Sequence, residues 1–197
     1  MAATISSTSA WSCPTRSSST TGRTTEAGGR GACMSPGADP LARLEGGCLC
    51  GALRYRLACD AVLCVYCCHC RDCQRLSSSA FSVSLVLPAA AFMLLQGDPK
   101  SIARRADSGR EVRGFFCGDC GTRLFDRVIG QPEIMVVKAA TLDDTAWLRP
   151  VAQFWTGRKQ AWVTLPQDQL VDARQPDNFA EVIALYRARH GGSDAGS

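Results

Sequence analysis

Three cysteines crowd into the six residues from Cys68 to Cys73, which read Cys-His-Cys-Arg-Asp-Cys. If residues 61–66 form a strand, side chains alternate between its faces, so Cys68 and Cys70 point the same way and His69 points the other way. Cys73 reaches the same place if the chain turns after Cys70. Zinc is the expected occupant, because thiolates suit this soft cation and three protein ligands leave one tetrahedral position open for chemistry.

A fourth ligand would close this group and make it structural. The candidates are Cys64, Cys67 and His69. Strand alternation turns Cys67 and His69 away, and Cys64 lies roughly 13 Å back along an extended strand, too far to share an ion with Cys68. We therefore favour an open three-sulfur site, and we interpret Cys64 and Cys67, together with Cys59, as buried small hydrophobic residues.

Two further cysteine pairs flank this cluster in the sequence. Cys48 and Cys50 lie on one face of an extended segment bordered by glycines, and Cys117 and Cys120 have the spacing of a zinc-knuckle turn. Together they offer four sulfurs, the complete ligand set of a structural tetrahedral site, which would clamp the first strand to a later one and stabilise the fold. The alternative, two unconnected pairs, leaves four thiols without a purpose. We expect two zinc ions per chain.

The 12 cysteines are the anomaly in a 197-residue chain that is 46% hydrophobic. The N-terminus shows no apolar signal-peptide core, and closely spaced cysteines chelate a metal better than they cross-link distant segments. Metal binding in a reducing compartment, most simply the cytoplasm, is therefore favoured over disulfides. No apolar run approaches the ~20 residues of a membrane span. A formal net charge of +4, close to neutral once thiolates and zinc are counted, argues against nucleic-acid binding.

The chain divides into three parts. Residues 1–42 are rich in Ser, Thr and Gly and have no hydrophobic periodicity, so we expect a disordered extension. Its composition is loosely that of an organelle transit segment; the interpretation we favour is an upstream start, with Met34 as the native beginning. Residues 43–190 form a single zinc-binding domain, and residues 191–197 form a flexible tail.

Short β-like runs separated by Gly, Pro and Asp fill most of the domain and predict a mainly β fold. Phe81–Leu87 alternates as a strand with one wet face should, whereas Glu133–Ala140 is a continuous apolar run that indicates burial on both faces. The one convincing long helix follows a cap at Asp177 or Asn178 and packs as a lid. The other predicted strands are Ala52–Leu57, Ala61–Cys67, Phe92–Leu95, Ser101–Arg105, Val112–Cys117 and Arg123–Val128.

Five stretches match the motifs of one known family. They read Gly-Gly-Cys-Leu-Cys-Gly-Ala-Leu-Arg-Tyr at 46–55, Cys-His-Cys-Arg-Asp-Cys-Gln-Arg at 68–75, Phe-Phe-Cys-Gly-Asp-Cys-Gly-Thr-Arg-Leu-Phe at 115–125, Thr-Leu-Asp-Asp at 141–144 and Trp-Leu-Arg-Pro at 147–150. The chain resembles, over about residues 44–165, the glutathione-dependent formaldehyde-activating enzyme family. The resemblance implies zinc-clamped, coiled antiparallel β-sheets of the type shared with methionine-R-sulfoxide reductases and translationally controlled tumour protein, with a helix at the C-terminal end.

The resemblance also implies a carbon–sulfur lyase that joins glutathione, or a similar thiol, to formaldehyde or another small aldehyde. The open zinc position would hold the thiol as a thiolate or polarise the carbonyl oxygen, and three thiolates on one dication favour the first role. Arg71 and Arg75 are candidates for binding substrate carboxylates, or else are ordinary surface arginines. The implied ligands are Cys48, Cys50, Cys117 and Cys120 for a structural zinc, and Cys68, Cys70 and Cys73 for a catalytic zinc.

Two positions depart from the family pattern. Ser78 stands where the family often has glycine, which would stiffen the substrate loop. Gln153 stands where it often has histidine, which removes a proton donor or acceptor near the site. A function of a different class is a zinc-stabilised interaction module without catalysis, as related centromere-associated members of the family suggest.

Overall fold

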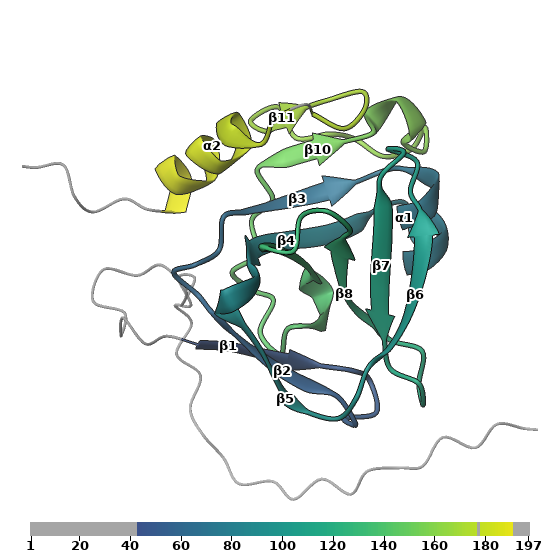
Figure 1. The fold of residues 1–197 in the computed structure, drawn as a ribbon. Coiled ribbons are helices and arrows are strands. Elements are labelled where there is room, and N and C mark those ends of the chain that lie inside the picture. The colour runs from purple at the N-terminus through teal and green to yellow at the C-terminus, as the bar shows by residue number, and fades with distance from the viewer. Residues whose placement is uncertain (1–42, 177, 191–197) are drawn as a thin grey trace, which may run out of the picture.

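The computed structural model describes residues 43–176 and 178–190, which form two β-sheets, a short helix and a longer C-terminal helix (Figure 1). The mainly β fold predicted from the sequence is confirmed. The predictions for residues 1–42, for Asp177 and for residues 191–197 lie outside the described residues.

The smaller sheet has three antiparallel strands in the order β1-β2-β5. Its middle strand alternates, since Tyr55 and Leu57 are buried while the arginines between them face outward. The outward arginines pair with acidic neighbours, so the polar face is electrostatically balanced. The strands are β1 (Arg43–Gly47), β2 (Arg54–Ala58) and β5 (Phe92–Gln96).

The larger sheet has eight strands in the order β11-β10-β3-β4-β9-β8-β7-β6. In Figure 1, β3 and β4 run roughly horizontally, whereas β6, β7 and β8 run roughly vertically. The sheet is therefore strongly coiled. The strands are β3 (Cys64–Cys68), β4 (Ser82–Pro88), β6 (Lys100–Arg105), β7 (Glu111–Phe116), β8 (Arg123–Val128), β9 (Ile134–Lys138), β10 (Ala152–Phe154) and β11 (Leu170–Val171).

One strand departs from the antiparallel arrangement that the family resemblance implies. β10 runs parallel to β3, with Gln153 opposite Cys67, and also parallel to β11. Parallel neighbours need a long connection, and here β4 to β9 lie between β3 and β10 in the chain. The local alternation pattern of a strand carries no information about the direction of such a distant partner.

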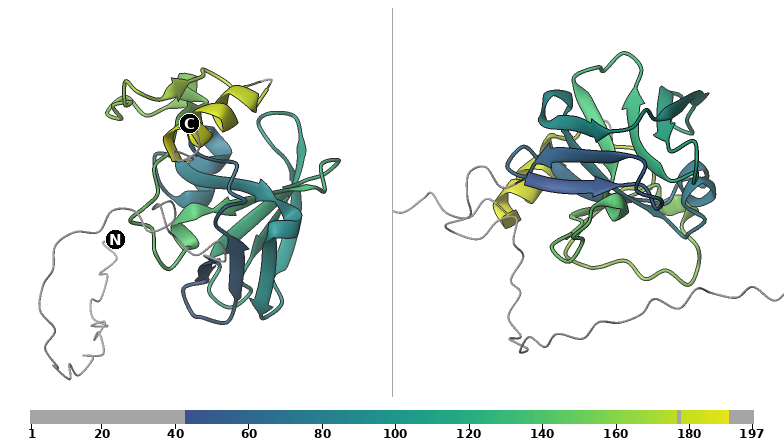
Figure 2. Two further views of the ribbon diagram at one scale, coloured as in Figure 1. Left: turned by 90° about the vertical axis from the view of Figure 1, so that its left-hand side faces the viewer. Right: turned by 90° about the horizontal axis from the view of Figure 1, so that it is seen from below.

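The inner faces of the two sheets share one apolar core. Tyr55 and Leu57 from the small sheet belong to the same cluster as Leu85 and Met135 from the large one. The aromatic rings of Phe92 and Phe125 meet between the sheets, with centroids 4.8 Å apart. In the right-hand view of Figure 2 the β1–β2 hairpin lies in front of the larger sheet, so the domain has two β layers at this end.

The prediction that Glu133–Ala140 is buried on both faces is wrong. In β9, Met135 and Val137 are buried, whereas Ile134, Val136 and Lys138 are only partly buried. The first pair faces the core, and the second set faces a cavity. Its apolar character on both faces therefore reflects two environments, a packed core and a binding space. The other predicted strands overlap observed ones, with small shifts at their ends.

The C-terminal helix confirms the sequence prediction. The side-chain oxygen of Asn178 accepts a hydrogen bond from the Ala180 backbone nitrogen at 2.8 Å, as a helix cap does, and Val182 and Tyr186 bury their side chains beside β3. A second helix, α1, was not predicted. The helices are α1 (Arg71–Ser77) and α2 (Ala180–His190), with 3-10 turns η1 (Ala89–Ala91), η2 (Ala139–Thr141) and η3 (Thr156–Arg158).

Neither α1 nor α2 has the length and apolar character needed to cross a membrane, and the same holds for every helix of residues 43–176 and 178–190.

Candidate metal centres and the adjoining cavity

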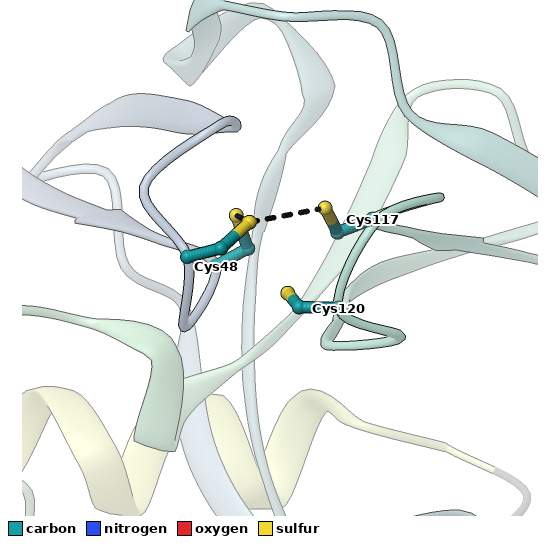
Figure 3. Close-up of side chains that lie close together, drawn as sticks. Cys48, Cys117 and Cys120 are labelled. Carbon is teal, nitrogen blue, oxygen red and sulfur yellow. Dashed lines mark hydrogen bonds between the residues drawn. The ribbon is translucent and has the colours of Figure 1, made fainter.

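Four cysteine sulfurs from two distant turns meet at one end of the molecule. Cys48 and Cys50 follow β1, and Cys117 and Cys120 lie in the turn between β7 and β8 (Figure 3). All four sulfur atoms lie within 4.8 Å of one another; the Cys48 and Cys50 sulfurs are 3.5 Å apart, and those of Cys50 and Cys117 are 3.7 Å apart. The structure therefore brings together the two pairs that the sequence analysis combined, and rejects two unconnected pairs.

Backbone conformation explains how both turns aim two sulfurs inward. Gly51 has φ +80° and Gly121 has φ +73°, values that glycine adopts without strain. Backbone and hydroxyl donors then fix individual sulfurs: the Leu53 nitrogen donates to the Cys48 sulfur at 3.2 Å, and the Thr122 hydroxyl lies 3.2 Å from the Cys120 sulfur. The Thr122 hydrogen bond is also the main cause that lowers the pKa of Cys120, to about 5. At Cys120 these donors favour the thiolate, the form that binds metals.

The three sulfurs of the second group meet where β3 passes into α1. Cys68 is the last residue of the strand, Cys70 is the N-cap of the helix, and Cys73 lies in its first turn. Their sulfurs lie within 4.8 Å of one another. The Cys70 sulfur accepts a hydrogen bond from the Cys73 backbone nitrogen at 3.3 Å. The predicted convergence is therefore present, and the chain turns by beginning a helix.

Hydrogen bonds among these three thiols concentrate negative charge on one sulfur. The thiols of Cys68 and Cys73 hold the pKa of Cys70 well below its usual range, and they outweigh the opposing effect of burial. The same hydrogen bond to Cys70 raises the pKa of Cys68. Three thiol sulfurs, of which Cys70 is favoured as a thiolate, form a donor set that suits a soft divalent cation. The donor set and its spacing therefore fit zinc.

The candidates for a fourth ligand lie elsewhere. Within the described ranges, the group contains no further His, Cys, Asp or Glu. Cys64 and Cys67 are buried free thiols outside it. His69 is fully buried on the other side of the chain, where its Nε2 lies 2.7 Å from Oε1 of Gln153. This agrees with the alternation predicted for the strand and leaves one side of the three-sulfur group without a protein ligand.

Gln153 occupies a different position from the one expected at the sequence level. Gln153 does not line the cavity beside the three sulfurs. It forms a hydrogen bond with His69, whose side chain lies on the opposite side of the chain from the sulfurs. An amide oxygen is an acceptor, so Nε2 of His69 donates this hydrogen bond, and its buried Nδ1 has no hydrogen-bond partner. Gln74 completes the support by donating to the His69 carbonyl at 2.7 Å. These buried amides brace the loop that carries the cysteines.

A cavity of about 350 Å³ borders the three-sulfur group, and none of the four sulfurs of the other group lines it. Four ion pairs contain cavity residues: Arg104 with Asp72 at 2.7 Å, Asp126 with Lys138 at 2.7 Å and with Arg123 at 2.5 Å, and Asp107 with Arg158 at 2.6 Å. A volume of this size is that of a small-molecule site, since such sites measure about 300–1,000 Å³.

The pair formed by Asp126 and Lys138 was missed in the sequence. Asp126 is 5% exposed and also accepts from Arg123, while its partner Lys138 stands on the neighbouring strand. The available signal was an acidic residue directly after two apolar residues, Leu124 and Phe125, in a predicted strand. Buried carboxylates are rarely left without a partner, so Asp126 could have been recognised as half of a pair, although not as a wall of the cavity.

The substrate-loop residues proposed from the sequence lie outside the cavity. Arg71 donates to the side chain of Gln74, and neither Arg71 nor Arg75 lines the space beside the sulfurs. Ser78 ends α1 with φ +51°, a left-handed conformation that favours glycine, and it too lies outside the cavity. Trp155, in contrast, lines the cavity, with the guanidinium of Arg158 placed 5.1 Å from its ring centre.

Comparison with known proteins adds two findings. A crystal structure of a Rhodobacter sphaeroides protein aligns with a TM-score of 0.41 and 19% sequence identity, over 54% of this chain and 91% of that one, a likeness too weak to carry an argument. The family model described as glutathione-dependent formaldehyde-activating enzyme matches residues 43–158, which include both cysteine groups. The chain therefore belongs to the family of glutathione-dependent formaldehyde-activating enzymes.

Proposed function

We propose that this chain is a zinc-dependent carbon–sulfur lyase that joins a thiol, glutathione or a similar compound, to a small aldehyde such as formaldehyde, and also catalyses the reverse reaction. The observation that carries the proposal is the position of the Cys68, Cys70 and Cys73 sulfurs at the wall of the 350 Å³ cavity. Membership of the family supports the same reaction class.

Each cysteine group is proposed to hold one zinc ion, giving two per chain. Cys48, Cys50, Cys117 and Cys120 form the closed, structural set, and Cys68, Cys70 and Cys73 form the open set beside the cavity. Zinc on the open set would supply a cation with a free position, which stabilises a thiolate or polarises a carbonyl group. The free thiols of both sets suit a reducing compartment, and we propose the cytoplasm.

Residues around the cavity can stabilise the negative charge that develops on the aldehyde oxygen during the reaction. Addition of a thiol to an aldehyde forms one carbon–sulfur bond, opens the carbonyl double bond and transfers the thiol proton to oxygen. Strand register places Lys138, Ser84 and Tyr66 side by side, one alternation step along the sheet from Cys68. All three line the cavity, so their ammonium and hydroxyl groups provide donors for the oxygen as it gains charge. The buried Asp126 carboxylate holds the Lys138 ammonium in place.

The proposal is tested by exchange NMR on an equilibrium mixture of glutathione and formaldehyde, with and without the zinc-loaded protein. The adduct forms without an enzyme, so the exchange rate is the diagnostic quantity. We expect faster exchange, lost in Cys70→Ser and retained in Cys67→Ser, which alters a neighbouring buried thiol outside the group. If no thiol and aldehyde pair exchanges faster in the presence of folded, zinc-loaded protein, the chain is an interaction module and the proposed reaction is wrong.

A further inference from the structure

The cavity has a direction, which the strand register defines. Cys68 is paired with Ser82. The next row of paired residues whose side chains face the cavity, two positions along each strand, contains Tyr66, Ser84 and Lys138. Each such row lies two residues, about 6.7 Å, beyond the previous one. The space therefore extends away from the three-sulfur group along β4 and β9, and a ligand that reacts at the sulfurs lays the rest of its body along these strands.

The far part of this space is apolar. In the row about 13 Å from Cys68, Val86 pairs with Val136, and Ile134 lies one row further along β9. Ile183 of α2 and Phe179, just before that helix, line the same cavity. We call these five side chains the apolar trough. It gives a ligand aliphatic and aromatic surface on the sheet side and on the helix side.

The charges of the cavity wall are largely neutralised by each other. Arg104 pairs with Asp72, and Lys138 pairs with Asp126, so these cations already have carboxylate partners. Among the cavity residues that the structure describes, two charged side chains have no ion-pair partner, Arg110 and Glu133, and they have opposite signs. The wall therefore offers a single uncompensated cation.

Glutathione fits this wall poorly. It has two carboxylates and one ammonium group, and a carboxylate taken into the cavity without a partner would lose its hydration without compensation. Binding the second carboxylate would require breaking an existing ion pair. An uncharged chain, by contrast, gains free energy for each methylene group that it removes from water.

We infer, on the basis of the proposed function, that the preferred thiol substrate is a lipophilic thiol, whose sulfur reaches the three-sulfur group while an uncharged hydrocarbon chain occupies the apolar trough. The aldehyde is small, so the chain belongs to the thiol. The carbon–sulfur bond forms, and the thiol proton passes to the aldehyde oxygen, as for any thiol in this reaction.

Three thiol compounds distinguish the effect of hydrocarbon length on binding from the effect of charge. N-octanoylcysteamine and N-acetylcysteamine share the same thiol and amide and differ in hydrocarbon length, whereas glutathione carries the charges. Binding to the zinc-loaded full chain is measured by backbone amide NMR titration, which needs no turnover. We expect N-octanoylcysteamine to bind at least about 30-fold more tightly than N-acetylcysteamine, and more tightly than glutathione. Equal binding of the two cysteamines, tighter binding of glutathione, or no binding of any thiol would overturn the inference.

Three substitutions on α2 test where the hydrocarbon chain binds. Ile183→Asp places a carboxylate in the apolar trough, whereas Ala184→Asp adds the same charge at an exposed neighbouring position. Ile183→Asp should weaken N-octanoylcysteamine binding by about tenfold or more and leave N-acetylcysteamine unchanged, while Ala184→Asp should alter neither. Ile183→Ala, a milder change, should weaken the octanoyl compound by about fivefold. An octanoyl preference that is undiminished in both Ile183 variants would place the hydrocarbon chain elsewhere and contradict the inference.

The exchange assay with formaldehyde separates this inference from the reaction on which it rests. If N-octanoylcysteamine binds in the trough but no thiol exchanges faster, the reaction is wrong and the ligand preference stands. If glutathione exchanges faster and N-octanoylcysteamine does not, the reaction stands and the lipophilic substrate is wrong.

Discussion

The two cysteine groups use the same ligand chemistry in opposite surroundings. The four-sulfur group joins two glycine-containing turns near the surface, where Cys50 is exposed, and its sulfurs do not line the cavity beside the other group. The three-sulfur group lies where a central strand passes into a helix, and its free side faces a cavity. Two turns that close from both sides complete a coordination shell, whereas a strand followed by a helix supplies ligands from one side. The number of sulfurs and the path of the chain beyond them are the two features on which we base the proposed structural role of one group and the proposed reactive role of the other.

The largest effect is expected when a ligand is removed from the four-sulfur group, which tests whether that group is structural. Cys117→Ser should unfold or aggregate the protein, because a structural metal site contributes its binding free energy to folding. We expect loss of most of the unfolding free energy, about 5–15 kcal/mol for an ordinary domain, measured by chemical denaturation. Cys67→Ser is the matched control, since Cys67 is a buried thiol in neither group. A Cys117→Ser protein as stable as the control would show that the closed group is not structural.

Removing a ligand from the open group should have a chemical effect with a smaller effect on the fold. Cys70→Ser should lower the zinc content from about two ions per chain to about one, as measured by elemental analysis, and should abolish accelerated exchange. Its denaturation midpoint should stay close to that of the unaltered protein. Unfolding comparable to that of Cys117→Ser would make the second site structural as well, and a zinc content near one before any substitution would contradict the two-site assignment.

The cavity wall provides a third comparison, between a buried and an exposed ion pair. Asp126→Asn leaves the Lys138 ammonium poorly paired and should destabilise the protein by about 3 kcal/mol. Asp107→Asn breaks the more exposed pair with Arg158 and should cost less than about 1 kcal/mol. Urea denaturation of both variants measures the difference. Equal costs would mean that the Asp126 pair is effectively solvated.

The smallest expected effect concerns the end of α1, the helix that begins at the open group. Ser78 holds a left-handed conformation that glycine adopts freely, so Ser78→Gly should stabilise the protein by about 0.5 kcal/mol. Ser79→Gly, at the adjacent residue whose φ is not positive, should instead be neutral or destabilising. Thermal unfolding of both variants distinguishes them; destabilisation by Ser78→Gly would show that the serine side chain, and not the backbone conformation, matters at this position.

Sequence spacing predicted which cysteines meet, because convergence of Cys68, Cys70 and Cys73 depends on a few adjacent backbone angles. The turn at Cys117 and Cys120 was predictable for the same reason. The prediction that this turn meets Cys48 and Cys50 came from counting ligands, because a structural tetrahedral zinc site needs four of them. The structure brings the four sulfurs together.

Features that depend on distant strands were out of reach of local patterns. The parallel partner of β3, and with it the place of Gln153 behind the cysteines, follows from a pairing between residues far apart in the chain. α1 has seven residues, too short for hydrophobic periodicity to identify. The alternation of β9 was hidden because both of its faces are apolar for different reasons, and the cavity that explains this exists only once α2 lies beside the sheet.

The separation between the two halves of the four-sulfur group has a consequence for how the protein assembles. The sulfurs of Cys50 and Cys117 meet across 67 positions, and Cys68, Cys70 and Cys73 all lie inside the ring that this contact closes. Closing so large a ring has an entropic cost, so we expect the contact to form late, after the local pairs β3–β4 and β6–β7. A newly made chain therefore has its reactive thiols gathered before the ring is locked. Metal supply during this interval determines whether those thiols take up a cation or are exposed to oxidation.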